Sequence, residues 1–346
     1  MMREKLMLLL GTAVVMGLGT VMPARGAIDS VDLSTYVRVG RYDLPEPTRT
    51  QAPTNSLLAQ EASAVTYDKD TDSLFVVGDG GTSVVQVSKT GQLIDSMTLA
   101  KDPTKPQGTY FYDTEGVTYV GGGKFVLVEE RYRQANLFTY VPNTTLGGGN
   151  VQTVKLGTTI GNIGIEGMTY DPMTGSYIAV KEKQPEGIFQ TFIDFTAGTA
   201  TNGSPTTVNS NNLFDPALLG VNDMSDVYAL SNLSSLAGHD DYSHLLVISQ
   251  ESGKVVETDR AGNIMSSLTL VSDPGNPLSI VDQGFEGVTM DDNGMLYLTS
   301  ENGGGDVNHP QLWVFAPQSV PEPASVMVLG LAALGCLVRR RNAIKR

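Results

Sequence analysis

Residues 165–171 read Ile-Glu-Gly-Met-Thr-Tyr-Asp, and close copies read Thr-Glu-Gly-Val-Thr-Tyr-Val at 114–120 and Phe-Glu-Gly-Val-Thr-Met-Asp at 285–291. A looser copy lies at 60–68, and a degenerate one lies at 224–229. The five copies are about 50 to 60 residues apart, close to the repeat length of propellers and solenoids. The chain is therefore predicted to contain five similar units.

Each copy is followed by the same order of structural signals. A turn rich in Asp, Gly or Asn comes first, then an apolar run, an alternating strand and, in most units, a fourth strand. The apolar runs have the β-branched and aromatic composition of strands buried on both faces, and they occupy 74–77, 125–128, 177–180, 245–248 and 296–299. Four antiparallel strands per repeat make a propeller blade.

The last unit ends near residue 315 and lacks a fourth strand, whereas an alternating strand at 36–44 precedes the first unit. We expect this N-terminal strand to pair with the last blade and close the ring, which removes the exposed edges. The predicted fold is all-β: a five-bladed β-propeller of four-stranded antiparallel blades, closed by an N-terminal strand in the last blade. Segment 195–222 is predicted to be an irregular insertion ahead of blade four.

The charge distribution excludes one class of partner. Without the two ends, the chain keeps 15 Lys and Arg against 35 Asp and Glu, a net charge of about −20. Such a surface repels phosphate backbones and attracts cations, so nucleic acid is not an expected partner. The only cysteine, Cys336, lies in the C-terminal apolar run, so no intrachain disulfide can form. We expect a monomer.

Both ends have the composition of targeting segments. Residues 1–26 combine a charged start, an apolar run and small residues before a cleavage point, as a secretory signal does. We therefore divide the chain into a signal peptide at 1–26, a closing strand and linker at 27–60, the propeller at 61–317 and a tail at 318–346.

The tail orders Pro321, Glu322 and Pro323, a short apolar run and an arginine cluster, and this order resembles the PEP-CTERM sorting signal. The resemblance implies recognition by exosortase-type machinery and transient anchoring in the inner membrane. Removal of the tail and delivery to the cell surface or extracellular matrix of a Gram-negative bacterium would follow. The alternative is a permanent tail anchor.

The repeat motifs resemble the SdiA-regulated family over residues 61 to about 315. The resemblance rests on the Glu-Gly-x-Thr motifs, on Lys-Glu-Lys at 181–183 and on Glu-Ser at 251–252. It implies a five-bladed propeller with a calcium site and no established activity. More distantly, the chain is similar to NHL-repeat proteins and to propellers described as esterase-like or phytase-like.

An acidic residue follows every apolar run, and the first two strands of a blade are antiparallel, so their acids share one rim. Asp79 is the first of these acids, and Glu61 opens the first unit. In the fourth unit Ser225 replaces the opening glutamate. The candidate metal ligands are Glu115, Glu130, Glu166, Glu182, Glu251, Glu286 and Glu301.

Two interpretations of this acid ring remain open. Oxygen ligands in a chain with one cysteine and three histidines favour a hard ion, and calcium accepts six to eight oxygens. Alternatively, each glutamate accepts backbone N–H bonds from the next blade as a latch. Lys181, Lys183 and Arg131 either pair with the acids or hold an anionic ligand or substrate. The His239-Asp240-Asp241 stretch and His244 suggest either a metal or catalytic pair or a solvated turn, and we favour the solvated turn. The glycines are assigned to close backbone approach.

Two functions follow from these features. The first is an exported, surface-sorted calcium-binding propeller that acts as a binding or matrix protein, with a matrix component or a small anionic ligand as partner. The second is a calcium-dependent phosphoesterase or esterase in which the metal activates water. The chain contains no Gly-x-Ser-x-Gly elbow, P-loop or zincin motif, which favours the first.

Overall fold

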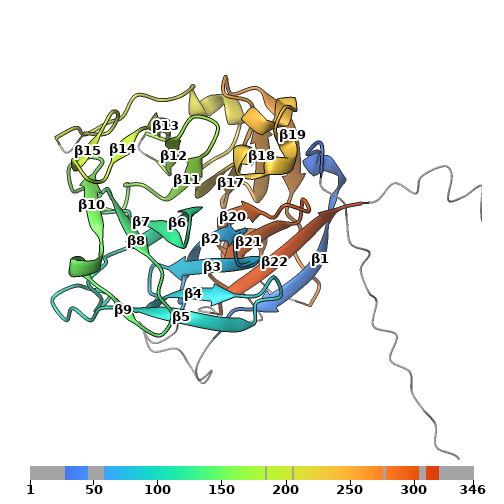
Figure 1. Ribbon diagram of the computed structural model, residues 1–346. Helices are drawn as coiled ribbons and strands as arrows, with labels where there is room; N and C mark the ends of the chain where they lie inside the picture. The colour runs from blue at the N-terminus through green and yellow to red at the C-terminus, as the bar shows by residue number, and fades with distance from the viewer. Residues whose placement is uncertain are drawn as a thin grey trace, which may run out of the picture.

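The computed structural model describes residues 28–45, 58–183, 185–204, 206–275, 278–303 and 309–318. Its main sheets surround a central axis as the blades of a five-bladed propeller (Figure 1). The predicted signal segment and, apart from Gln318, the predicted sorting tail lie outside these residues. Among the residues that the structure describes, no helix is long and apolar enough to cross a membrane.

Blades one, two and four each contain four antiparallel strands in the predicted order. Blade one also pairs its outermost strand in parallel with a short fifth strand. Blade one contains β2 (Ala62–Asp68), β3 (Ser73–Gly78), β4 (Ser83–Val87), β5 (Leu93–Leu99) and β9 (Thr145–Leu146). Blade two contains β6 (Thr114–Gly121), β7 (Lys124–Glu129), β8 (Gln134–Thr139) and β10 (Gln152–Lys155). Blade four contains β16 (Asp226–Ala229), β17 (Leu245–Ser249), β18 (Lys254–Thr258) and β19 (Ile264–Thr269).

Blade three has three strands, β11 (Gly167–Asp171), β12 (Ser176–Lys181) and β13 (Gly187–Thr191). A separate ribbon of β14 (Ile193–Asp194) and β15 (Thr199–Ala200) follows. The predicted insertion covers the free edge, because Leu213 N donates to Ile188 O of β13 at 2.7 Å. The short helices are η1 (Leu33–Thr35), η2 (Gly148–Asn150), η3 (Pro216–Leu219), η4 (Leu230–Asn232), η5 (Ser234–Leu236), η6 (Asp240–Ser243) and α1 (Ile280–Gln283).

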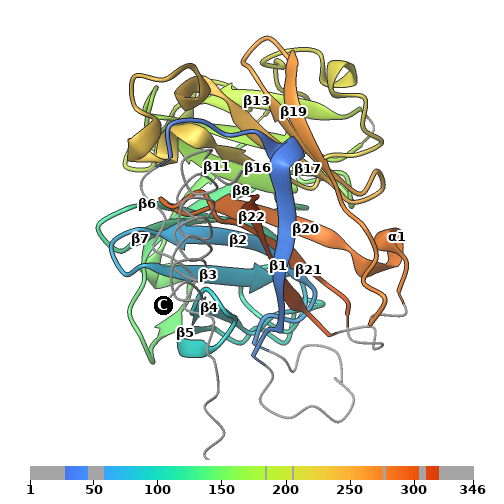
Figure 2. The same ribbon diagram turned by 90° about the vertical axis from the view of Figure 1, so that its right-hand side faces the viewer.

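Blade five confirms the predicted closure. Its sheet order is β1 (Tyr36–Asp43), β22 (Gln311–Pro317), β21 (Leu296–Ser300) and β20 (Phe285–Met290), so the N-terminal strand forms the outer edge of the last blade (Figure 2). Strand β22 begins opposite Ser300 and runs antiparallel to β21. The chain therefore leaves the last blade at the rim away from the end of β21.

The core consists of apolar layers between neighbouring blades. In β7, Phe125 and Leu127 pack toward blade one, whereas Val126 and Val128 pack toward blade three. Successive side chains of a strand point to opposite faces, so a continuous apolar run fills two layers at once. This is why the second strand of each unit has no polar face.

Side-chain hydrogen bonds join each inner strand to the next around the axis. In four of the five cases the acceptor is the threonine of the repeat motif. The backbone N–H groups of Tyr119, Tyr170, Ala229 and Tyr67 donate, respectively, to the hydroxyls of Thr66, Thr118, Thr169 and Thr289, at 2.9 to 3.2 Å. The fourth blade lacks that threonine, and Asp226 Oδ2 accepts from Val288 N at 3.0 Å instead. Thr and Asp therefore join the inner strands. The glutamate latch expected from the sequence is present at Glu130, whose Oε1 accepts from Gly164 N, just ahead of blade three, at 2.8 Å.

The glycines of the Glu-Gly pairs are required where inner strands approach each other. A Cβ on Gly167 would lie 2.6 Å from Asp226 Cα, and one on Gly287 would lie 2.7 Å from Val65 N. Both contacts are to backbone atoms of a neighbouring blade, so a side chain at either position would push two inner strands apart. Close backbone approach at the axis, predicted from the motif, is confirmed.

Candidate metal centre

One mouth of the channel contains a cavity of about 240 Å³ with acidic walls. Six of the seven predicted ligands meet there, and the remaining one, Glu251, lies outside the walls. The fourth blade contributes Gln250, the residue directly after β17, and Glu61 does not line the cavity. The lining residues are Asp79, Glu115, Glu130, Arg131, Asn162, Glu166, Glu182, Gln250, Glu286 and Glu301.

Irregular strand pairing positions the opening glutamates. In blade two, Thr114 pairs with Glu129 and Gly116 pairs with Val128, so Glu115 is skipped as the extra residue of a β-bulge. In blade five, the pairing of β20 with β21 passes over Glu286 in the same way. A bulge residue is not held to the regular alternation of the sheet, so its side chain can turn toward the channel.

The second set of acids comes from the ends of the next strands. One acid follows directly after the second strand of four blades: Asp79 after β3, Glu130 after β7, Glu182 after β12 and Glu301 after β21. Because β3, β7, β12 and β21 are antiparallel to the inner strands, their ends lie beside the beginnings of those strands. This explains why residues about 15 positions apart in each unit line one cavity.

Burial and mutual repulsion make this carboxylate group costly to ionise. Burial raises the pKa of Glu115, Glu166 and Glu286 well above the ordinary value of 4.5, and neighbouring acids raise it further. Burial and the Asp113 carboxyl raise the pKa of Asp79 to about 7. Burial and Glu61 likewise raise the pKa of Glu301 to about 7. The ionised form of this cluster therefore requires positive charge from elsewhere.

The predicted basic residues neutralise only part of this charge. Arg131 lines the cavity, forms an ion pair with Asp113 and lies 3.8 Å from the Glu130 carboxylate. Lys183 Nζ lies 2.5 Å from Glu182 Oε1 and 2.8 Å from Glu251 Oε1. Both residues thus pair with acids, which is one of the two roles expected from the sequence.

The donor set fits a hard cation with oxygen ligands. The carboxylate oxygens of Asp79, Asp113 and Glu115 all lie within 4.8 Å of one another. Two ligands of one calcium ion are at most about 4.8 Å apart, since each Ca–O distance is about 2.4 Å. Gln107 Nε2 donates to Asp79 Oδ1 at 2.9 Å and so orients one member of this trio. The sequence did not indicate Asp113, because it lies in a loop and outside the repeat motif.

Lys181, the third predicted basic residue, lines a different cavity, together with Arg133. Strand alternation explains the separation, because Lys181 and Glu182 are successive residues and point to opposite sides. Burial lowers the pKa of Lys181, and the positive charge of Arg133 lowers it further. Burial also lowers the pKa of Arg133.

His244 differs from the predicted solvated turn. It is buried, and its Nδ1 lies 2.9 Å from Glu257 Oε1 and 3.5 Å from Asp241 Oδ1. Asp241 in turn accepts from Val31 N at 2.7 Å. These contacts connect blade four to the segment before β1, and burial of that segment over the turn could not be read from local polarity.

The fold and this cavity define the class of the protein: a five-bladed β-propeller with a carboxylate-lined channel mouth. The family described as SdiA-regulated matches residues 48–303, and the chain belongs to that family. A PEP-CTERM protein-sorting motif matches residues 319–342. That motif indicates export and surface sorting in Gram-negative bacteria, with recognition by exosortase-type machinery.

Several solved structures match this chain at low identity. Myxococcus xanthus glutaminyl cyclase has 11% identity and a TM-score of 0.43, over 81% of this chain and 95% of that one. A luciferin-regenerating enzyme has 10% identity and a TM-score of 0.44, over 75% and 92%. Kuenenia stuttgartiensis hydrazine synthase has 12% identity and a TM-score of 0.38, over 74% of this chain and only 58% of that chain.

Proposed function

We propose that this protein is an exported, surface-sorted calcium-binding propeller that acts as a binding or matrix protein, after transient anchoring of its tail in the inner membrane. The observation that supports the calcium site is the cavity of about 240 Å³ with seven carboxylates and one basic residue in its walls. A bound divalent cation would offset the excess negative charge of the walls, because one ion neutralises several buried carboxylates together.

Asp79, Asp113 and Glu115 are the residues proposed to hold the ion, and Glu166 and Glu286 face them from other blades. The amide oxygen of Gln250 adds a neutral ligand of the kind that calcium accepts, whereas Asn162 Oδ1 accepts from the Arg131 guanidinium. The bound ion would supply positive charge at the mouth and so attract an anionic group of a matrix component.

The test is thermal unfolding of chelator-treated protein with and without added calcium. Calcium at 100 times its Kd is expected to stabilise the fold by about 2.7 kcal/mol, which appears as a rise in Tm. The double variant Asp79→Asn/Glu115→Gln removes two of the three proposed ligands, and two changes are expected. Its metal-free Tm should be higher than that of the wild type, because two buried acids are gone, and its response to calcium should be lost.

The matched control is Asp29→Asn/Asp240→Asn, which also removes two acids but at exposed sites. This variant should keep the full calcium response. Equal melting temperatures of the wild-type protein with and without calcium would exclude the metal site.

The hydrolase alternative requires basic residues free to hold a substrate anion beside the metal. Arg131 is the basic residue in the cavity walls, and it is already paired with Asp113. This arrangement favours the binding function. Turnover of a phosphomonoester or an ester by calcium-loaded protein, lost in the Asp79→Asn/Glu115→Gln variant, would reverse that preference.

A further inference from the structure

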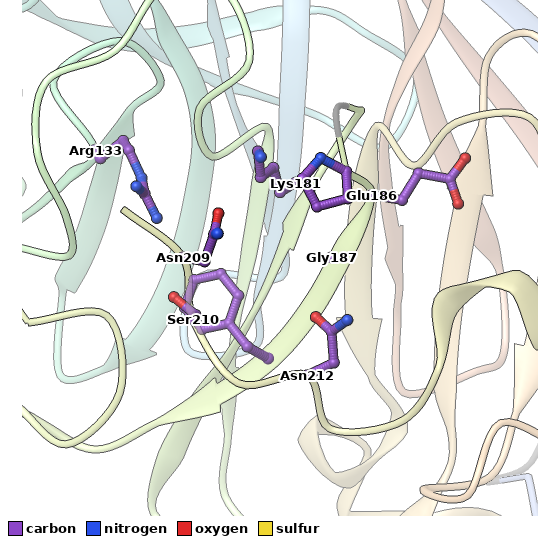
Figure 3. A pocket seen from close by; sticks show the side chains of 9 residues that line it. Arg133, Lys181, Glu186, Gly187, Asn209, Ser210 and Asn212 are labelled. Carbon is purple, nitrogen blue, oxygen red and sulfur yellow. The ribbon is translucent and has the colours of Figure 1, made fainter. Parts of the chain in front are cut away.

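A second pocket, separate from the acidic cavity, lies between the turn after β7 in blade two, the β12–β13 connection of blade three and residues 209–212. Its volume is about 50 Å³, enough for a group of a few heavy atoms. Figure 3 shows the guanidinium of Arg133 directed toward Asn209 and Ser210, with Lys181 beside them. The walls thus combine two cationic side chains with hydroxyl and amide groups.

Arg133 is 2% exposed, so its guanidinium has been removed from water. Its Nη1 donates to the Val208 carbonyl, and its Nε is buried with no hydrogen-bond partner among the described residues. Within the same part of the chain, Arg133 forms no ion pair. A buried, charged N–H without an acceptor is energetically costly, so a group that enters the pocket and accepts from it would remove that cost.

The surrounding chain is shaped to keep the guanidinium in this position. A Cβ on Gly157 would lie 2.4 Å from Arg133 Cζ, so only glycine leaves room for the group. Arg133 itself has a φ of 47°, a conformation that is costly for a residue other than glycine.

The polar groups around Arg133 match an oxyanion. Ser210 Oγ is also buried without a partner among the described residues, and it can donate one hydrogen bond. Asn209 and Asn212 provide exposed amides at the pocket opening. Glu186 is the one acid in the walls, and Figure 3 shows its carboxylate pointing away from Arg133.

We propose that this pocket binds an oxyanion group, a carboxylate or a phosphate, that belongs to a ligand approaching from solvent. The Nε side of the Arg133 guanidinium presents two parallel N–H groups, a geometry that matches two oxygens of one oxyanion. Lys181 contributes positive charge, and Ser210 donates to a third oxygen position. The site is independent of the calcium site, since the two cavities share no lining residue.

The experiment is isothermal titration calorimetry of the full-length chain in chloride buffer at constant ionic strength, with sodium acetate and methyl phosphate as probes. At least one probe should bind to wild type. Arg133→Gln should raise its Kd by about tenfold or more, because a charge-assisted hydrogen bond contributes about 1.5–3 kcal/mol. Arg133→Lys, which keeps the charge but lacks the planar fork, should give an intermediate Kd.

Two further variants test the geometry without the buried arginine being removed. Ser210→Ala should weaken binding by about threefold to tenfold for the loss of one hydrogen bond. Glu186→Gln should tighten binding, because it removes a negative charge from the walls. Lys124→Gln, at an exposed site, should leave the Kd unchanged.

The relative affinities of acetate and methyl phosphate identify the source of the oxyanion, and either preference supports the proposal. The proposal is overturned if neither probe binds wild type, or if Arg133→Gln and Ser210→Ala both bind as wild type does. Repetition of the titration in chelator separates this site from the calcium site, because oxyanion binding should persist without the metal.

Discussion

Thr118 shows what a single side chain contributes at the axis. Its hydroxyl accepts from Tyr170 N of the next blade at 2.9 Å, and the residue is 4% exposed. The same position is threonine in four of the five units, so the motif carries a hydrogen bond between blades as well as the Glu-Gly pair. The repeated threonines are visible in the sequence. Threonine is common in β-strands, however, so their presence alone did not predict a hydrogen bond between blades.

Thr118→Val is expected to lower the free energy of unfolding by about 1–3 kcal/mol, because Tyr170 N is left buried without an acceptor. Urea unfolding measures the change. Thr118→Ser keeps the hydroxyl and should retain most of the stability. Thr98→Val, on an exposed outer position, is the control and should change little. A Thr118→Val protein as stable as wild type would show that this hydrogen bond between blades contributes nothing.

Asp171 provides a pH-dependent contact between blades three and four. It is fully buried and accepts from Ser231 at 2.6 Å, Thr174 at 2.6 Å and Arg260 at 3.1 Å. Burial alone would raise the pKa of Asp171, but these hydrogen bonds outweigh it and hold the pKa below the ordinary value of 3.8. The stability that the ionised group contributes is therefore present above pH about 4 and is lost as the pH falls through the lowered pKa.

Arg260→Gln is expected to cost about 1–2 kcal/mol at pH 7, a modest figure because Arg260 keeps some contact with water. The cost should shrink as the pH falls from 7 to 3 and approaches the lowered pKa of Asp171, because protonation removes the charge that Arg260 pairs with. Urea unfolding at both pH values gives the comparison. A cost that is the same at pH 7 and pH 3 would contradict the role assigned to Asp171.

At the scale of elements, β1 is the strand that turns five blades into a closed ring. Val31, Leu33, Tyr36 and Leu44, in and around β1, are each at most 6% exposed. They enter two different apolar layers, one on each side of blade five. Burial of four such side chains is worth roughly 6–12 kcal/mol, which is comparable to the whole stability of a domain.

A chain that lacks residues 28–45 is therefore expected to lose the cooperative unfolding transition, as measured by circular dichroism during heating. A synthetic peptide of residues 28–45, added in excess, should restore the transition, because strand addition to an open edge re-forms the same ladder. A scrambled peptide of the same composition is the control. Cooperative melting of the truncated chain without peptide would show that closure by β1 is dispensable.

The elements were largely predictable from the sequence, whereas the direction of individual side chains was not. Apolar runs such as 125–128 indicate strands buried on both faces, and the structure confirms this. The side-chain direction of the residue just after a strand is harder to predict. The fourth unit places Gln250 in the acidic cavity and Glu251 outside it, a difference of one position that reverses the side-chain direction.

At the scale of the whole molecule, the repeat spacing predicted the five-bladed ring and its closure, because both follow from counting strands per unit. The acidic cavity followed from the same count, since antiparallel strands bring the ends of two strands to one rim. The pocket of Arg133 and Lys181 did not follow. It depends on where residues 206–212 lie relative to blade three, and irregular loops carry no periodic signal from which their course can be derived.

The register of the last blade also determines how the molecule would be displayed. Glu301 follows β21 at the acidic mouth, and β22 runs from Gln311, opposite Ser300, to Pro317 at the far rim. A protein tethered through the residues beyond 318 would therefore stand with the acidic mouth turned away from its attachment. The carboxylates would then meet the surrounding medium first, and the tether would not obstruct a ligand that approaches from outside.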